Sequence, residues 1–205
     1  MPGNYNRKDR FYEQAKRAGY RSRAAYKILE LNKKFDVLHH GARVLDLGAC
    51  PGGWLQVSGE LIGAAGVAVG IDLVQIDSFN DPRIHIIQGD VRNEAVLKQA
   101  LSVAGGRFDV VLSDMSPKLT GISEVDRSAA VGLNELAIWV CQFTLVPAGN
   151  FITKVFKSNE TEQFVKSIRP AFNKVVRSEL DATRKTSNEF YVAGLGYKGP
   201  IQELA

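Results

Sequence analysis

The chain has 205 residues, enough for one domain with a full hydrophobic core. Hydrophobic residues make up 45% of it and charged residues 23%, which is typical of a soluble globular protein and excludes a fibrous or low-complexity chain. No apolar run reaches the roughly 18 residues that a membrane span needs, and the N-terminus has no apolar signal core, so we expect a cytoplasmic protein.

The first 34 residues carry a net charge of +7, although the whole chain carries only +4. Aromatic residues are interleaved with these lysines and arginines, as in surfaces that bind a polyanion. A basic tail that stays in solvent explains the charge as well, so charge alone does not identify a nucleic acid as the partner.

Beyond this segment, apolar runs of strand length alternate with helical patterns. This alternation predicts a doubly wound α/β fold around a parallel sheet. Two further strands follow without a helix between them, which indicates an antiparallel hairpin, so we expect seven strands with the last one antiparallel. The expected strands are 43–47, 67–73, 84–88, 108–113, 150–156, 174–179 and 189–195, and the expected helices are 53–62, 94–103, 126–145 and 160–171.

The first strand runs into a glycine-rich turn, Gly48-Ala-Cys-Pro-Gly-Gly-Trp54. Such a turn between a strand and a helix lets backbone N–H groups approach a nucleotide ligand closely. The spacing Gly-x-x-x-Gly-Gly differs from the Gly-x-Gly-x-x-Gly of dinucleotide sites, which argues against NAD. A simple strand-to-helix connection is the alternative interpretation.

Three aspartates end successive strands: Asp72, Asp90 and Asp114. Asp72 lies about 20 positions beyond the glycine turn, where a carboxylate can accept both hydroxyls of a ribose. Because the carboxyl ends of parallel strands meet in one crevice, we expect the three to face a shared ligand. Each of them is also a good helix N-cap or turn residue, above all Asp90, which precedes a predicted helix.

Lys154 stands inside the otherwise apolar strand 150–156. Burying an unpaired ammonium is costly, so this side chain must reach solvent, a partner or a substrate. It could extend to solvent from the end of the strand. It could instead pair with Asp114, at the end of the neighbouring strand, or with Glu189, at the start of the last strand.

Five motifs follow one another along the chain: Arg21-Ser-Arg-Ala-Ala-Tyr-Lys27, Pro51-Gly-Gly-Trp54, Ser113-Asp-Met-Ser-Pro117, Thr153-Lys-Val-Phe156 and Ser187-Asn-Glu-Phe-Tyr191. Together they resemble the FtsJ/RrmJ family of S-adenosylmethionine-dependent RNA ribose 2′-O-methyltransferases, from about Tyr20 to Tyr197. The resemblance implies a Rossmann-like, class I methyltransferase fold in a single domain, residues 20–205. A basic, flexible segment, residues 1–19, is expected to precede it.

The resemblance also implies which residues are catalytic and which bind the cofactor. The family's catalytic tetrad falls on Lys27, Asp114, Lys154 and Glu189. Its contacts with S-adenosylmethionine fall on Gly52, Trp54, Asp72, Asp90 and Asp114, and the argument from the glycine turn adds Gly48 and Gly53.

Methyl transfer to a ribose hydroxyl requires a base for the hydroxyl proton. By analogy with the family, Lys154 is that base, and it has to be neutral when the oxygen attacks. The positive charges of the sulfonium and of Lys27 favour the neutral form, whereas Asp114 and Glu189 oppose it. If the carboxylates prevail, Lys154 orients the hydroxyl and Asp114 receives the proton.

Only RNA carries a 2′-hydroxyl, so the tetrad and the basic N-terminus together indicate RNA as the partner. Bacterial-type family members without an appended domain methylate one uridine in the A-loop of large-subunit rRNA within the assembled particle. We expect that substrate, a monomer and no membrane partner. Related members act on tRNA or on mitochondrial rRNA, and tRNA is the first alternative.

The second alternative is a non-catalytic RNA-binding factor in ribosome assembly, against which the complete tetrad argues. The third is an NAD-dependent reductase, which the glycine spacing and Lys154 disfavour. No metal is implied, because the three histidines do not cluster with acids or cysteines in a ligand pattern. Cys50 stands where the family has alanine and is unexplained, and Lys118 follows Pro117 in a loop expected to face the substrate.

Overall fold

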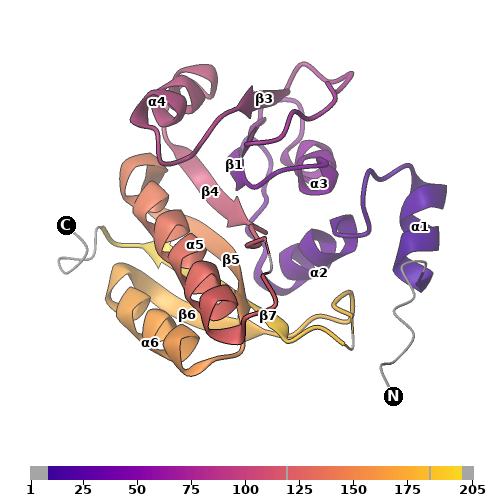
Figure 1. Cartoon of the computed structure of the whole chain (residues 1–205). Helices are drawn as coiled ribbons and strands as arrows, with labels where there is room; N and C mark the ends of the chain where they lie inside the picture. Colours follow the sequence, from indigo (N-terminus) through magenta and orange to yellow (C-terminus); the bar gives the residue numbers. More distant parts are fainter. Residues whose placement is uncertain (1–8, 119, 185, 200–205) are drawn as a thin grey trace.

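The computed structural model describes residues 9–118, 120–184 and 186–199 (Figure 1). Seven strands in this part of the chain form one sheet in the order β3-β2-β1-β4-β5-β7-β6. All neighbouring strands are parallel except at β7, which is antiparallel to both β5 and β6. The strands are β1 (Arg43–Leu47), β2 (Val67–Asp72), β3 (Ile84–Gln88), β4 (Phe108–Ser113), β5 (Leu145–Phe156), β6 (Phe172–Ser178) and β7 (Glu189–Tyr197).

Helices cover both faces of this sheet, as Figure 1 shows. One hydrophobic cluster joins the strands to α4, α5 and α6, and a second cluster on the opposite face joins them to α2 and α3. The expected class I architecture with the last strand antiparallel is therefore confirmed. The helices are α1 (Arg10–Ala18), α2 (Ala25–Phe35), α3 (Gly53–Ile62), α4 (Glu94–Val103), α5 (Ser123–Thr144) and α6 (Asn159–Ile168), followed by the short 3₁₀ helix η1 (Arg169–Ala171).

The structure adds two helices that the sequence analysis did not predict, α1 and α2. Helix α2 packs on the sheet through Ile28 and Leu31, which are fully buried, and it carries Lys27 in its first turn. Helix α1 covers residues 10–18 of the basic segment 1–19, starts at the N-cap Asp9 and ends at Gly19 in a left-handed conformation. Part of the basic N-terminal segment, residues 10–18, is thus helical.

Several other boundaries differ from the expected ones; β2, β6 and β7 do so by only one or two residues at an end, and three differences are larger. Strand β5 begins at Leu145 rather than residue 150, because its first residues pair with β4 across a register shift. Helix α5 begins at Ser123 rather than residue 126, and the last helix divides into α6 and η1 at Arg169 because Pro170 follows. None of the described helices is long and apolar enough to cross a membrane.

Candidate active site

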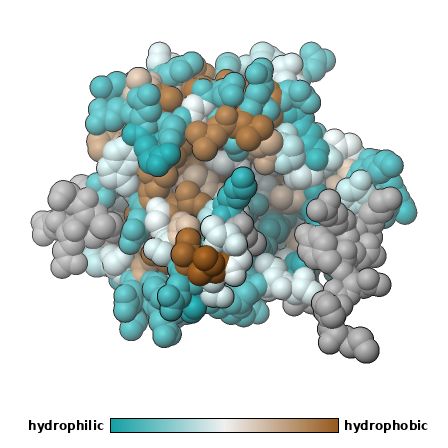
Figure 2. Space-filling view, in the orientation of Figure 1, coloured by the Kyte–Doolittle hydropathy of each residue, from teal (hydrophilic) through white to brown (hydrophobic). Residues whose placement is uncertain are grey.

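A cavity of about 570 Å³ opens at the carboxyl ends of β1, β2, β3 and β4. Four of the predicted cofactor residues line it: Gly48, Asp72, Asp90 and Asp114. The remaining lining is mostly apolar and comes from the strand ends and from α5; it includes Ile71, Val91, Met115, Leu133 and Leu136. Figure 2 shows apolar surface gathered in a hollow near the middle of one face, rimmed by hydrophilic side chains.

Asp72 and Asp90 are held in place by different hydrogen-bond donors. Asp72 accepts the backbone N–H groups of Cys50 and Val74 at 2.9 and 2.8 Å, which fixes the carboxylate at the turn. Asp90 pairs with Arg92, whose Nε lies 3.0 Å from both carboxylate oxygens and whose side-chain and backbone donors lower the pKa of Asp90. Helix α4 is capped by Asn93, so Asp90 is not its N-cap.

Gly48 is required by the shape of the turn. Its φ is +73°, and a Cβ there would lie 2.7 Å from Cγ of Met115. The absence of a side chain at Gly48 therefore allows Met115 to pack directly against the backbone of the turn at the edge of the cavity. Cys50 also lines the cavity, but its backbone N–H rather than its thiol makes the contact with Asp72, so the turn places no demand on this side chain.

The other half of the glycine turn faces away from the cavity. Among the described residues that line it, Gly52, Gly53 and Trp54 do not appear, and their assignment as cofactor contacts stays a prediction. Trp54 is 3% exposed and donates its indole N–H to the carbonyl of Ala24 at 2.8 Å. A Cβ on Gly53 would lie 2.4 Å from Oγ of Ser22. These three residues therefore form the surface against which the segment before α2 packs.

Arg21, in the segment before α2, binds this segment to the loop after β2. Its guanidinium donates to the carbonyls of Asp77 and Ser78, both at 2.6 Å, and lies 3.6 Å from the ring centroid of Phe79. A Cβ on Gly52 would lie 2.6 Å from the same ring, so the glycine makes room for this stack. The loop that begins at Asp72 is thereby joined to the segment that leads to Lys27.

The predicted tetrad comes together at the edge of the cavity. Lys154 is only 7% exposed; its Nζ donates to the carbonyl of Asp114 at 2.7 Å and lies 3.2 Å from the Asp114 carboxylate. Lys27 Nζ lies 2.6 Å from Glu189 Oε1 and 4.0 Å from the Asp114 carboxylate. Of the two acids predicted to satisfy Lys154, Asp114 does so, whereas Glu189 is bound by Lys27.

A second cavity, of about 480 Å³, adjoins this cluster. Lys27 and Glu189 line it, together with two arginines, Arg23 and Arg184. Ser116 lines both cavities, so the tetrad lies where the two meet.

The sequence matches the family model of FtsJ-like methyltransferases over residues 20–197. The chain belongs to the FtsJ-like methyltransferase family. It is 41% identical to ribosomal RNA large subunit methyltransferase E of Pseudomonas fluorescens over 93% of this chain and 91% of that protein, and 38% identical to the protein of that name from Methanobrevibacter smithii over 93% and 90%.

Solved structures agree with this family assignment. A structure described as a ribosomal RNA methyltransferase of Plasmodium falciparum superposes with a TM-score of 0.76 at 27% identity, covering 88% of this chain and all of that one. Fibrillarin of Aeropyrum pernix, solved with natively bound S-adenosyl-L-methionine, superposes with a TM-score of 0.59 at 14% identity over 83% and 76% of the two chains, and shows that the fold is shared.

The sequence analysis missed one polar residue of this FtsJ-like site, Tyr191. Its hydroxyl donates to the Asp114 carboxylate at 2.8 Å, and its ring lies 6.0 Å from that of Trp54. Burial, with Asp114 and Glu189 nearby, raises the pKa of Tyr191 well above its ordinary value, so the hydroxyl keeps its proton and orients Asp114. The signal was present, since Glu189 and Tyr191 share one face of a strand of period two.

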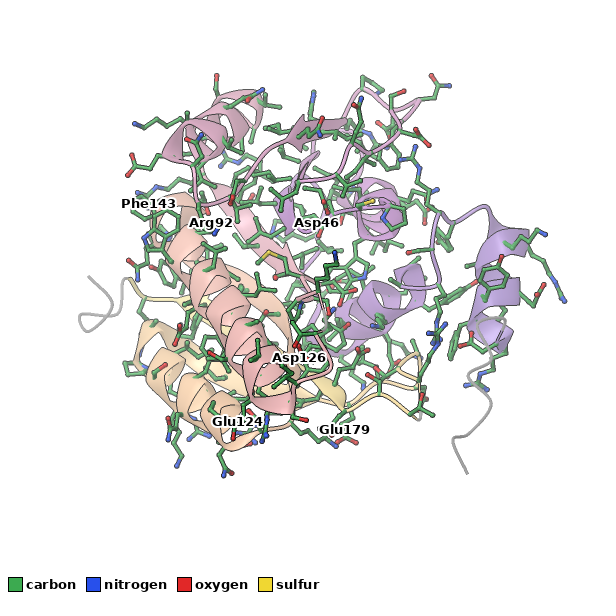
Figure 3. All side chains as sticks on the ribbon, in the orientation of Figure 1. Asp46, Arg92, Glu124, Asp126, Phe143 and Glu179 are labelled. Carbon is green, nitrogen blue, oxygen red and sulfur yellow. The ribbon has the colours of Figure 1, made fainter. Side chains whose placement is uncertain are left out.

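A second missed residue, Asp46, lies inside β1 of the FtsJ-like domain. It is 1% exposed, and its Oδ2 has no hydrogen-bond partner among the described residues. Burial, with Asp114 and Asp72 nearby, raises the pKa of Asp46 well above its ordinary value. In Figure 3, Asp46 lies near the middle of the molecule, among side chains of the strands and helices. An acidic residue in an otherwise apolar central strand was the sequence signal.

The raised pKa of Asp46 predicts a pH-dependent loss of stability. Above the ordinary pKa of an aspartate the unfolded chain releases this proton while the folded protein keeps it, so stability falls as pH rises toward the raised folded pKa. We expect Asp46→Asn to abolish this loss. Its free energy of unfolding relative to the original protein should increase as pH rises above the ordinary aspartate pKa of about 4, by at most about 1.4 kcal/mol per pH unit, in urea titrations.

Asp181→Asn, at an exposed aspartate, is the matched control for this measurement. Its unfolding free energy should run parallel to that of the original protein across the same pH range. Parallel curves for Asp46→Asn as well would contradict a raised pKa at Asp46.

Proposed function

We propose that this protein is an S-adenosylmethionine-dependent methyltransferase that modifies a ribose 2′-oxygen in large-subunit rRNA. The observation that carries the proposal is the position of Lys154. Its Nζ lies beside Asp114, which lines the first cavity, and the neighbouring pair of Lys27 and Glu189 lines the second. Two cavities that share Ser116 and adjoin this cluster fit a reaction between a nucleotide-like donor and a hydroxyl acceptor.

The residues of the first cavity fit S-adenosylmethionine. Asp72 has a fixed carboxylate for ribose hydroxyls, and the apolar lining suits the flat adenine ring. The missing side chain of Gly48 leaves a cradle that a Cβ would fill. When bound, the cofactor supplies an electrophilic methyl group on a positively charged sulfur, and acidic residues at this cavity favour that charge.

The acceptor ribose would enter the second cavity, with its 2′-hydroxyl at Lys154. The amine of Lys154 is positioned by the Asp114 carbonyl and takes the hydroxyl proton as general base. Because Lys27 is tied to Glu189 at 2.6 Å, the positive charge of Lys27 is partly neutralised before the substrate arrives. Asp114, held by Tyr191, is the nearest group to which Lys154 can pass a proton.

The choice of RNA rests on the relatives and on charge. The relatives compared above are named ribosomal RNA large subunit methyltransferases, and the N-terminal 34 residues carry a net charge of +7. A uridine of the A-loop, presented in the assembled large subunit to a monomeric, cytoplasmic enzyme, is the target that we propose. The complete tetrad favours an enzyme over an assembly factor that only binds RNA, and tRNA is the alternative substrate.

Methyl transfer from labelled S-adenosylmethionine tests the proposal. Purified protein should label large ribosomal subunits isolated from cells that lack it, and nuclease mapping should place the label on a ribose 2′-oxygen. Label in tRNA instead would replace the proposed substrate. Absence of label from all RNA fractions, with RNA binding retained, would favour the assembly factor.

A further inference from the structure

Asp9 joins three parts of the chain that are distant in sequence. Its Oδ1 accepts the backbone N–H of Tyr12 at 3.0 Å and caps α1. Its Oδ2 is bound by two guanidiniums, that of Arg23, before α2, and that of Arg184, in the loop between β6 and β7, whose Nε lies 3.3 Å away. One carboxylate oxygen is therefore shared by two arginines.

These two arginines also line the second cavity, in which the tetrad residues Lys27 and Glu189 lie. The side chains of Asp9, Arg23 and Arg184 are 28%, 15% and 27% exposed, so the ion pairs lie at the mouth of the cavity rather than in the core. Arg23 also donates to the carbonyl of Ala182, which fixes its orientation toward this mouth.

The chemistry of this arginine pair matches a phosphodiester. A phosphodiester, like a carboxylate, offers two oxygens that share one negative charge, and guanidinium binds both groups through the same paired N–H donors. Both arginines stay charged at all working pH values. In RNA the 2′-oxygen and the 3′-phosphate are on adjacent carbons of one ribose. A ribose whose 2′-hydroxyl reaches the tetrad therefore brings a phosphate to the wall of the same cavity.

We infer that Arg23 and Arg184 form the binding site for the backbone phosphate next to the methylated ribose, and that Asp9 occupies this site until RNA displaces it. The inference rests on the proposed function, since it assumes an RNA acceptor in the second cavity. Asp9 then keeps the two like-charged guanidiniums together in the free protein, and it competes with RNA for them.

Asp9→Asn removes the negative charge that competes with RNA but keeps the cap of α1, because asparagine caps a helix as well as aspartate does. We expect this variant to bind a fluorescein-labelled oligouridylate about 3- to 10-fold more tightly in anisotropy titrations without methyl donor, since an occupied site lowers apparent affinity by its free fraction. Glu13→Gln, an equal change of charge at an exposed position of α1, is the control and should change affinity far less.

Arg184→Gln tests the site itself, at a side chain that is 27% exposed, and its melting temperature shows whether the variant folds normally. We expect weaker binding and a slope of log affinity against log salt that is smaller by about 0.7, the value for one lost contact with single-stranded phosphate. In the Arg184→Gln background, Asp9→Asn should no longer tighten binding.

Two results would overturn the inference. One is an Asp9→Asn protein with a normal melting temperature that binds the oligouridylate no better than Glu13→Gln; the other is an Arg184→Gln protein with unchanged affinity and salt slope. Both measurements are of equilibrium binding. A failure of the proposed methyl transfer would appear separately, as missing label in ribosomal subunits with the binding pattern intact.

Discussion

Lys154→Ala should lower the rate of methyl transfer by about 10²- to 10⁴-fold, the contribution expected of a positioned general base. Lys154 is buried, and its amine lies 2.7 Å from the carbonyl of Asp114, which lines the first cavity. Loss of the amine removes the proton acceptor but leaves the first cavity intact, because Lys154 does not line it. Single-turnover assays with labelled S-adenosylmethionine should show the loss, while calorimetry shows unchanged cofactor binding.

Two further variants sharpen this test. Lys157→Ala removes an exposed lysine near the same strand end, whose side chain pairs with the exposed Glu179, and should leave the rate near that of the original protein. Lys154→Arg keeps the positive charge but cannot lose its proton, so it should stay inactive if Lys154 is a base. Substantial activity in Lys154→Arg would assign Lys154 to orientation of the hydroxyl and the proton to Asp114.

Trp54→Ala should reduce the free energy of unfolding by about 3 to 5 kcal/mol, as expected for a large buried aromatic residue. Trp54 is 3% exposed, contacts the ring of Tyr191 and donates to the carbonyl of Ala24. The substitution creates a cavity at the point where the segment before α2 lies on the domain. It also removes one of the two donors to that carbonyl, the other being the backbone N–H of Lys27. Urea titrations followed by circular dichroism measure the change.

Trp139→Ala is the matched control. Trp139 lies on α5, is only partly buried and packs on Phe143, which is 41% exposed, so its loss should cost clearly less. Trp54→Phe keeps an aromatic ring but loses the N–H, and because the Ala24 carbonyl still accepts the backbone N–H of Lys27, the lost hydrogen bond should cost about 0.5 to 1.5 kcal/mol. If Trp54→Ala were as stable as Trp139→Ala, the packing role of Trp54 would be wrong.

The sequence was sufficient to predict most of the sheet. Strands β1, β3 and β4 have the expected bounds, because each is a short apolar run that ends at a glycine or a polar residue. The tetrad could be placed because the resemblance supplied motifs that the fold then brings together. Helix α1 was not predicted, since only Ala15 in it is buried and its many charged residues are also typical of a basic segment that stays in solvent.

The remaining features depend on contacts that no local pattern encodes. The pairing of Lys27 with Glu189 joins α2 to β7, and the contact of Asp9 with Arg184 joins residues 175 positions apart. The glycine turn illustrates the same limit. Its sequence indicated a ligand cradle along its whole length, but Gly48 and Cys50 line the cavity, whereas Gly53 and Trp54 support another segment of the chain.

The stack of Arg21 on Phe79 has a consequence for the order of events in catalysis. Residues 77–79 follow Asp72, which lines the first cavity, and Arg21 precedes Lys27 by less than two helical turns. A ligand in the first cavity that orders the loop after β2 therefore also orders the segment that leads to Lys27. Less conformational entropy is then lost when the second ligand fixes Lys27. We expect the two substrates to bind cooperatively, each raising the affinity for the other by the same factor.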